Sequence, residues 1–188
     1  MAAILVRARG RDNRAMPFRS TPLIAAAVVL AACSPALDWR EVRPDGSGAA
    51  LMLPCRPASH ARDVVLAGAP ARLTLYACNT SGMTWALAYA DLDDPGRVRL
   101  ALRELRAAAA TNLGAGPDRP LDWRMAGATP HAESGRFELQ GRLPAGKAVR
   151  EQVAVYARGT TVYQATVVGE TLDPEAVEVF FSGLRLLS

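Results

Sequence analysis

Histidine, lysine and cysteine are scarce in this sequence: 188 residues contain two histidines, three cysteines and one lysine, Lys147. Zinc normally takes four well-spaced nitrogen or sulfur ligands, so His60 and His131 alone do not predict a metal site. The chain also lacks a phosphate-binding loop and a nucleophile elbow, and the glycines at 114–116 follow a predicted helix instead of opening one. We therefore expect no metal, no cofactor and no catalytic residue, and a protein that is not an enzyme.

Clustered positive charge is also missing from most of the chain. Five of the 22 basic residues and one of the 18 acidic residues lie among residues 1–32, so this segment accounts for the whole net charge of +4. The remaining 17 basic and 17 acidic residues cancel. A nucleic-acid-binding domain keeps a basic patch on one face. The sequence therefore predicts no nucleic-acid partner.

No hydrophobic run is long enough for a permanent membrane span. The longest, residues 23–32, has about half of the ~20 apolar residues that a bilayer requires. Arginines precede it and small residues end it, which is the arrangement of a secretory signal peptide. We predict a signal peptide over residues 1–32, with a retained anchor as the alternative.

The residues Leu30-Ala31-Ala32-Cys33 resemble the lipobox of bacterial lipoproteins. That resemblance implies that the Cys33 thiol receives a diacylglyceryl group, that acyl chains such as palmitate hold the protein on a membrane, and that residues 33–37 form a tether. Two or three chains anchor stably, because each buried methylene contributes about 0.8 kcal/mol. Ser34 after the cysteine implies the outer membrane, facing the periplasm, in a Gram-negative cell. The alternative is a cleaved secretory signal followed by an incidental cysteine.

Two further cysteines, Cys55 and Cys78, lie in or beside strand-like runs. An even number of cysteines in a chain bound for an oxidising compartment indicates a disulfide. Two separate buried thiols, or a metal site that includes His60, are the alternatives.

Residues 38–188 are expected to form one α+β domain with a mainly antiparallel sheet. Asp94-Pro95 and Asp173-Pro174 each combine a helix cap with a proline at the first helical position. They predict a long helix that ends at Gly114, with Val98, Leu102, Leu105 and Ala109 as its apolar stripe, and a short C-terminal helix. Alternating patterns predict strands over 39–42, 49–54, 72–78, 83–90, 121–126, 136–143, 149–158 and 161–168, with residues 56–68 mostly loop.

Alternation within residues 83–90 separates large from small side chains. Trp85, Leu87 and Tyr89 are expected on one face of the sheet, and Thr84, Ala86 and Ala88 on the other. Asp91, Asp93 and Asp94 are interpreted as capping residues before the long helix; a calcium loop is the alternative, and Pro95 interrupts its spacing.

The order of these elements carries a resemblance. The succession is a strand with Met52-Leu53-Pro54, a hairpin that ends Ala88-Tyr89-Ala90, a helix, a Val-Tyr-Gln strand and a final Phe180-Phe181-Ser182-Gly183-Leu184 element. In this order the chain resembles the PsbP-like and DcrB-like family of small exported domains. The resemblance implies an α/β/α sandwich and a non-enzymatic accessory or binding role at a membrane.

Three functions are compatible with these features. The first is an envelope interaction module, held to the membrane by its lipid and bound to another envelope protein. The alternative is a carrier of a small ligand in an apolar cleft between helix and sheet, with Trp85, Tyr89 and Phe181 as the ligand or partner face. An enzyme ranks third and would require polar groups that converge around His60 or His131.

Overall fold

The computed structural model describes residues 37–187, so Cys33, the signal peptide and most of the tether lie outside the described residues. A seven-stranded sheet dominates it, with the order β3-β4-β5-β9-β8-β7-β6 and antiparallel pairing between all neighbours. Its strands are β3 (Ala58–Leu66), β4 (Ala69–Thr80), β5 (Met83–Asp91), β6 (Arg119–Leu121), β7 (Gly135–Arg142), β8 (Ala148–Arg158) and β9 (Thr161–Gly169).

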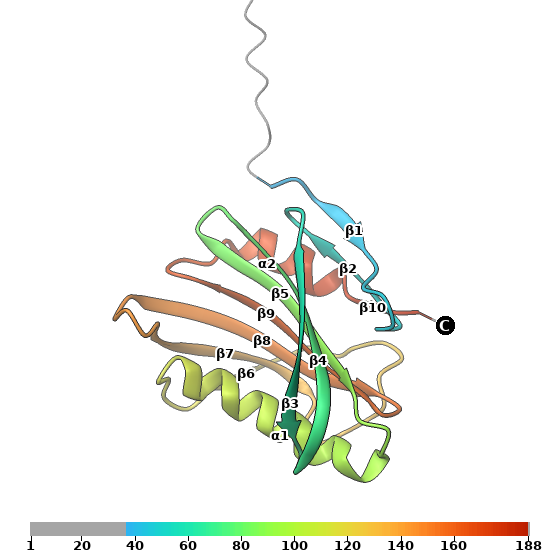
Figure 1. Ribbon diagram of the computed structural model, residues 1–188. Helices are drawn as coiled ribbons and strands as arrows, with labels where there is room; N and C mark the ends of the chain where they lie inside the picture. Colours follow the sequence, from blue (N-terminus) through green and yellow to red (C-terminus); the bar gives the residue numbers. More distant parts are fainter. Residues whose placement is uncertain (1–36, 188) are drawn as a thin grey trace, which may run out of the picture. The chain divides into compact units, whose positions relative to one another are not determined.

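Each face of this sheet is covered by a different layer (Figure 1). The helix α1 (Pro95–Asn112) packs on one face against β8 and β9. The opposite face carries α2 (Pro174–Ser182) and a three-stranded sheet of β1 (Arg40–Val42), β2 (Ala49–Leu53) and β10 (Arg185–Leu186). The predicted α+β class, with a mainly antiparallel sheet and two helices, is confirmed.

Large aromatic side chains fill the layer under α2. The rings of Tyr156 and Tyr163, paired across β8 and β9, stack with centroids 4.8 Å apart. The Tyr163 hydroxyl donates to the carbonyl oxygen of Ser47 at 2.5 Å and so ties the segment before β2 to the main sheet. Phe180 and Phe181 close this core from α2. The layer is therefore packed with side chains from both sheets and the helix.

The predicted helix starts are confirmed in detail. The Asp94 carboxylate accepts a hydrogen bond from the backbone N–H of Gly96, and that of Asp173 accepts from Glu175 and Ala176. The side chain of Asp91 accepts from the backbone N–H of Asp93, so the acidic cluster shapes the turn before α1. The predicted apolar stripe of α1 is buried against the sheet.

Two segments differ from their predictions. Residues 56–68 were expected to be mostly loop, but β3 occupies Ala58–Leu66. It is an end strand of the sheet and most of its residues are exposed. Its sequence therefore lacks the alternation of apolar and polar residues on which the strand predictions depend. The strand predicted over 121–126 is also wrong beyond Leu121, because only Arg119–Leu121 pairs with β7 before the chain leaves the sheet.

Candidate ligand-binding site

The position of α1 leaves part of one sheet face open. At the start of α1, the Arg97 guanidinium donates to the carbonyl oxygens of Leu66 and Ala69 in the β3–β4 turn. Near the end of α1, the backbone N–H of Arg142 in β7 donates to the carbonyl oxygen of Leu113. The helix therefore crosses the sheet diagonally, from the β3–β4 turn to β7 (Figure 1).

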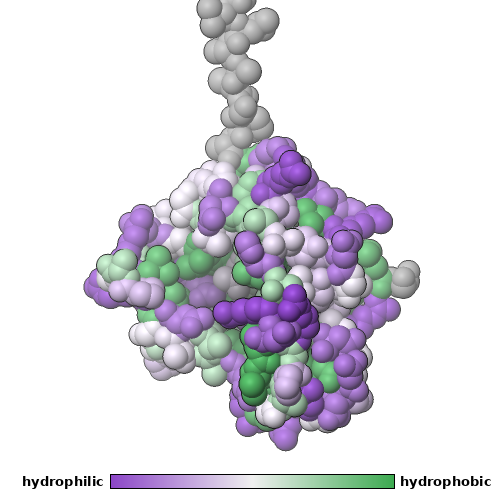
Figure 2. Space-filling view, viewed as in Figure 1, coloured by the Kyte–Doolittle hydropathy of each residue, from purple (hydrophilic) through white to green (hydrophobic). Residues whose placement is uncertain are grey.

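A groove of about 700 Å³ lies beside α1 on this face; we name it the α1 groove. Its floor is formed by β4, β5, β9 and β8, and its walls by the last turn of α1, the β7–β8 turn and β3. Figure 2 shows the surface hollowed here, with hydrophobic residues gathered at the margins. Its apolar lining includes Leu73, Leu75, Ala86, Ala88, Ala109, Leu113, Leu143 and Val168.

Small side chains explain why the floor is hollow. The alternation predicted for residues 83–90 is confirmed, because Trp85, Leu87 and Tyr89 all belong to the core under α2. Ala86 and Ala88 point the other way and line the groove. Ala88 lies between Leu75 of β4 and Gln164 of β9. The same strand therefore fills one face of the sheet with aromatic rings and leaves space on the other.

The most unusual residue of the α1 groove is Glu151 of β8. It lies between Val168 of β9 and Leu139 of β7, and only 6 % of its surface is exposed. Among residues 37–187 no hydrogen bond or ion pair reaches its carboxylate. Burial away from water raises the pKa of Glu151 to about 7, because the charged form loses its solvation. The groove thus contains a carboxyl group that titrates near neutrality.

Sequence reasoning missed Glu151, although a signal was present. In the predicted strand 149–158, period-two alternation places Glu151 on the same face as Val149, Val153 and Val155. A lone carboxylate in a row of buried valines is rarely accommodated without a partner. That row could therefore have identified the residue as a candidate site.

The other polar groups of the groove are few. The Gln164 amide nitrogen lies 3.5 Å from the Thr166 hydroxyl oxygen, and both side chains lie on the floor. His60 and Arg62 are exposed on β3 and form part of the rim, and Asn112 ends α1 there. The groove is therefore an apolar trough with one buried ionisable group and two exposed ones.

Trp85, Tyr89 and Phe181, the expected ligand or partner face, are buried under the opposite face of the sheet. The Trp85 ring lies between those of Trp39 and Phe180, with centroids 5.8 and 5.6 Å away. The Tyr89 hydroxyl donates to the carbonyl oxygen of Asp45 at 2.5 Å. None of the three expected residues lines the α1 groove, since they face α2 and the cleft lies beside α1.

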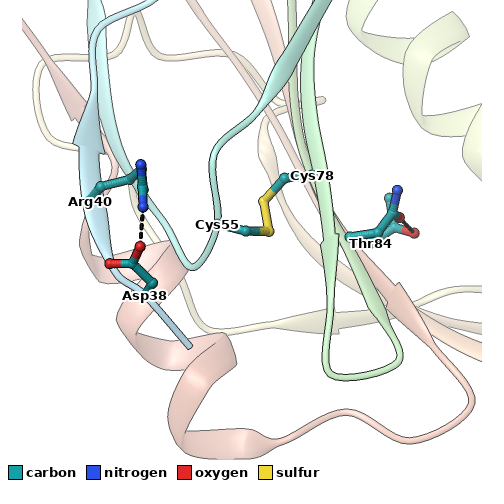
Figure 3. The surroundings of a disulfide bond; sticks show 6 residues. Asp38, Arg40, Cys55, Cys78 and Thr84 are labelled. Atoms are coloured by element: carbon teal, nitrogen blue, oxygen red, sulfur yellow. Dashed lines mark hydrogen bonds and ion pairs between the residues drawn. A yellow bond between two sulfur atoms is a disulfide. The ribbon is translucent and has the colours of Figure 1, made fainter. Parts of the chain in front are cut away.

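The predicted disulfide between Cys55 and Cys78 is confirmed (Figure 3). The two Cα atoms lie 5.9 Å apart, and the bond joins the segment after β2 to β4. It therefore links the small-sheet layer covalently to the main sheet, on the face that packs against α2.

A second hollow, of about 490 Å³, lies under the loop before β7 and contains His131. Ser134 and Tyr156 also line it, and their hydroxyl oxygens are buried without a hydrogen-bond partner among residues 37–187. The neighbouring Glu133 pairs with Arg103 of α1 at 3.2 Å. His60 and His131 therefore lie in two different hollows. In the described part of the chain, no three His, Cys, Asp or Glu side chains are grouped to hold a metal ion.

No family model and no curated protein matches this chain. Within residues 37–187, neither helix has the length and hydrophobicity needed to cross a membrane.

Proposed function

We propose that this chain is an exported, lipid-anchored envelope protein that binds an apolar small molecule, without catalysis, in the α1 groove. The observation that carries the proposal is the groove itself. Its volume of about 700 Å³ lies within the range of roughly 300–1,000 Å³ that ligand sites occupy, and its lining is mainly apolar with a few polar groups. Each 100 Å² of apolar surface that a ligand covers contributes roughly 2.5 kcal/mol.

The location is proposed from the leader. The basic residues, the apolar run and Leu30-Ala31-Ala32-Cys33 support export and acylation of Cys33, and Ser34 supports an outer-membrane position in a Gram-negative cell. The layered order of helix, sheet and helix is in keeping with membership of the PsbP-like and DcrB-like family, which we also propose.

Binding of N-phenyl-1-naphthylamine, a neutral probe whose fluorescence rises in apolar surroundings, tests the groove. We expect saturable binding by the full chain that weakens about tenfold in Ala88→Leu, because the larger side chain fills the floor. The control is Ser59→Leu, which adds the same side chain at an exposed position of β3 outside the groove lining. Absence of saturable binding, or equal binding by both variants, would contradict the proposal.

The outer edge of β3 supports a second candidate, an interaction module for another envelope protein. Within residues 37–187, β3 is the end strand of its sheet and pairs only with β4. Most of its residues are exposed, and Val65 is 76 % exposed. An extended segment of a partner can add to such an edge by backbone hydrogen bonds.

Photo-crosslinking in intact cells distinguishes this second candidate. A crosslinker at Val65 should yield one reproducible protein adduct, whereas the same crosslinker at Glu175, exposed on α2, should not. Equal adducts from both positions, or none from Val65, would count against a partner on β3.

A further inference from the structure

We infer that the ligand of the α1 groove is a cationic amphiphile, an elongated apolar molecule whose single ammonium group binds the Glu151 carboxylate. This inference rests on the proposed function of the groove and names the chemical class of its ligand. It is carried by the position of one unpaired carboxyl group inside an otherwise apolar trough.

The surroundings of Glu151 leave its carboxylate without a natural partner. Its neighbours across the sheet are Val168 and Leu139, and no described cation reaches it. A buried carboxylate either accepts a proton or pairs with a cation, because isolated charge is costly in apolar surroundings. A ligand that brings an ammonium group supplies that pair, and a longer apolar body covers the alanine and leucine side chains of the floor.

A hydroxyl group near Glu151 fits the same head group. An ammonium group carries three donors and no acceptor. Gln164, Thr166 and Val168 alternate along β9 on the groove face, with Val168 paired to Glu151. Thr166 is the nearer of the two polar residues to Glu151, and its hydroxyl oxygen has a second lone pair that can accept besides the bond from the Gln164 amide. The floor therefore offers acceptors from two strands.

The basic residues at the rim of the α1 groove, in contrast, would favour an anionic head group. The ionisable residues that line the groove are Glu151 on the floor and His60 and Arg62 on β3. Both β3 side chains are exposed, so solvent and salt screen their charge. Glu151 is buried, where electrostatic interactions are stronger. The buried carboxylate should therefore decide the preferred charge of the ligand.

Binding of an ammonium ion should be coupled to a proton. Where Glu151 is protonated, the ion binds only as the carboxyl group releases its proton to solvent, which forms the carboxylate–ammonium pair. Because burial raises the pKa of Glu151 to about 7, most of the carboxyl groups have already released their proton at pH 8, whereas most still hold it at pH 6. Affinity for the cation should therefore rise from pH 6 to pH 8.

Three ligands of equal chain length test the inference: dodecylammonium, dodecanol and dodecanoate. Each is titrated against bound N-phenyl-1-naphthylamine, below its micellar concentration, on the full chain carrying Cys33→Ala so that no attached acyl chain competes. We expect dodecylammonium to bind about tenfold more tightly than dodecanol at pH 8, with a smaller preference at pH 6. Glu151→Gln should remove the preference and retain dodecanol binding. The control Glu170→Gln, whose carboxylate pairs with Lys147 outside the groove, should keep it.

The other outcomes separate the two proposals. If dodecanol binds as tightly as dodecylammonium, or if the preference persists in Glu151→Gln, the cationic ligand is wrong while the groove remains a binding site. Tightest binding by dodecanoate would assign recognition to His60 and Arg62 and overturn the inference. If no ligand displaces the probe and the probe itself does not bind, the proposed function of the groove fails as well.

Discussion

The guanidinium carbon of Arg136 lies 4.0 Å from the centroid of the Phe181 ring, which stacks a buried cation of β7 on an aromatic side chain of α2. Arg136 is only 4 % exposed. Its guanidinium also donates to Gln152 at 2.9 Å and to Glu178 at 2.6 Å. One side chain thus holds α2 to the sheet through the ring of Phe181 and the carboxylate of Glu178, and is itself held by Gln152 of β8.

Replacing Arg136 should therefore destabilise the fold. Arg136→Met fills a similar volume but leaves Gln152 and Glu178 without their donor, and we expect it to lower the free energy of unfolding by about 2–3 kcal/mol. Urea denaturation measures the change. The control is Arg72→Ala, which breaks an exposed pair with Asp63 and should cost less than about 1 kcal/mol. Equal losses in both variants would refute the role assigned to Arg136.

The disulfide should stabilise the fold by lowering the conformational entropy of the unfolded chain. Cys55 and Cys78 are separated by 23 positions, and closing a loop of this length stabilises by roughly 3 kcal/mol on the chain-entropy model. We expect the double variant Cys55→Ala, Cys78→Ala to unfold at lower urea than the oxidised chain. Reductant should lower the stability of the unmodified chain only. A midpoint that does not respond to reductant would show that the bond is absent in solution or adds nothing.

Much of this architecture is predictable from local patterns. The Asp-Pro pairs at 94–95 and 173–174 predict both helix starts, because each aspartate has only to accept bonds from the next few residues. Alternation in residues 83–90 correctly separates the face of Trp85 from that of Ala86. Helix caps and strand alternation depend only on residues close together in the chain, so they can be predicted from a single sequence.

The candidate site depends on tertiary relationships that the sequence does not express. Aromatic residues were expected to line a cleft, but Trp85 and Phe181 fill the core because α2 and the small sheet pack over them. The groove exists because α1 crosses only part of the opposite face, and contacts at both ends of the helix, from Arg97 to the β3–β4 turn and from Arg142 to Leu113, hold it there. The direction of α1 thus depends on contacts between residues about 30 positions apart, which local sequence patterns do not reveal.

The lipid anchor makes a separate prediction, independent of the groove. Cys33→Ala removes the thiol that would receive the diacylglyceryl group, so the exported protein should move from the membrane fraction to the soluble fraction. Fractionation and the mass of the N-terminal peptide measure this change. Ser34→Ala keeps the cysteine and is expected to leave the protein on the membrane. An unmodified N-terminal peptide in the original chain, with membrane association unchanged in Cys33→Ala, would refute the anchor.

Glu151 should make the stability of the fold depend on pH near neutrality. Burial raises its pKa from 4.5 to about 7 in the folded chain, so the folded state binds more protons than the unfolded state between these values. The contribution of Glu151 is fully present below about pH 4.5 and is lost as the pH rises through 7. Because each pKa unit corresponds to about 1.4 kcal/mol, the loss amounts to roughly 3 kcal/mol.

Urea denaturation between pH 5 and pH 8 measures this loss. Glu151→Gln cannot ionise, so we expect its stability to match that of the original chain near pH 5 and to exceed it by roughly 2–3 kcal/mol at pH 8. Asp122→Asn alters an exposed carboxylate on the loop after β6 and should keep the original slope. The range ends at pH 5 because the pKa values of Asp91 and Asp118 are lowered by hydrogen bonds, which gives an opposite slope in stronger acid. Parallel profiles for Glu151→Gln and the original chain would show that the carboxyl group is hydrated in solution, and would remove the basis for its role in the groove.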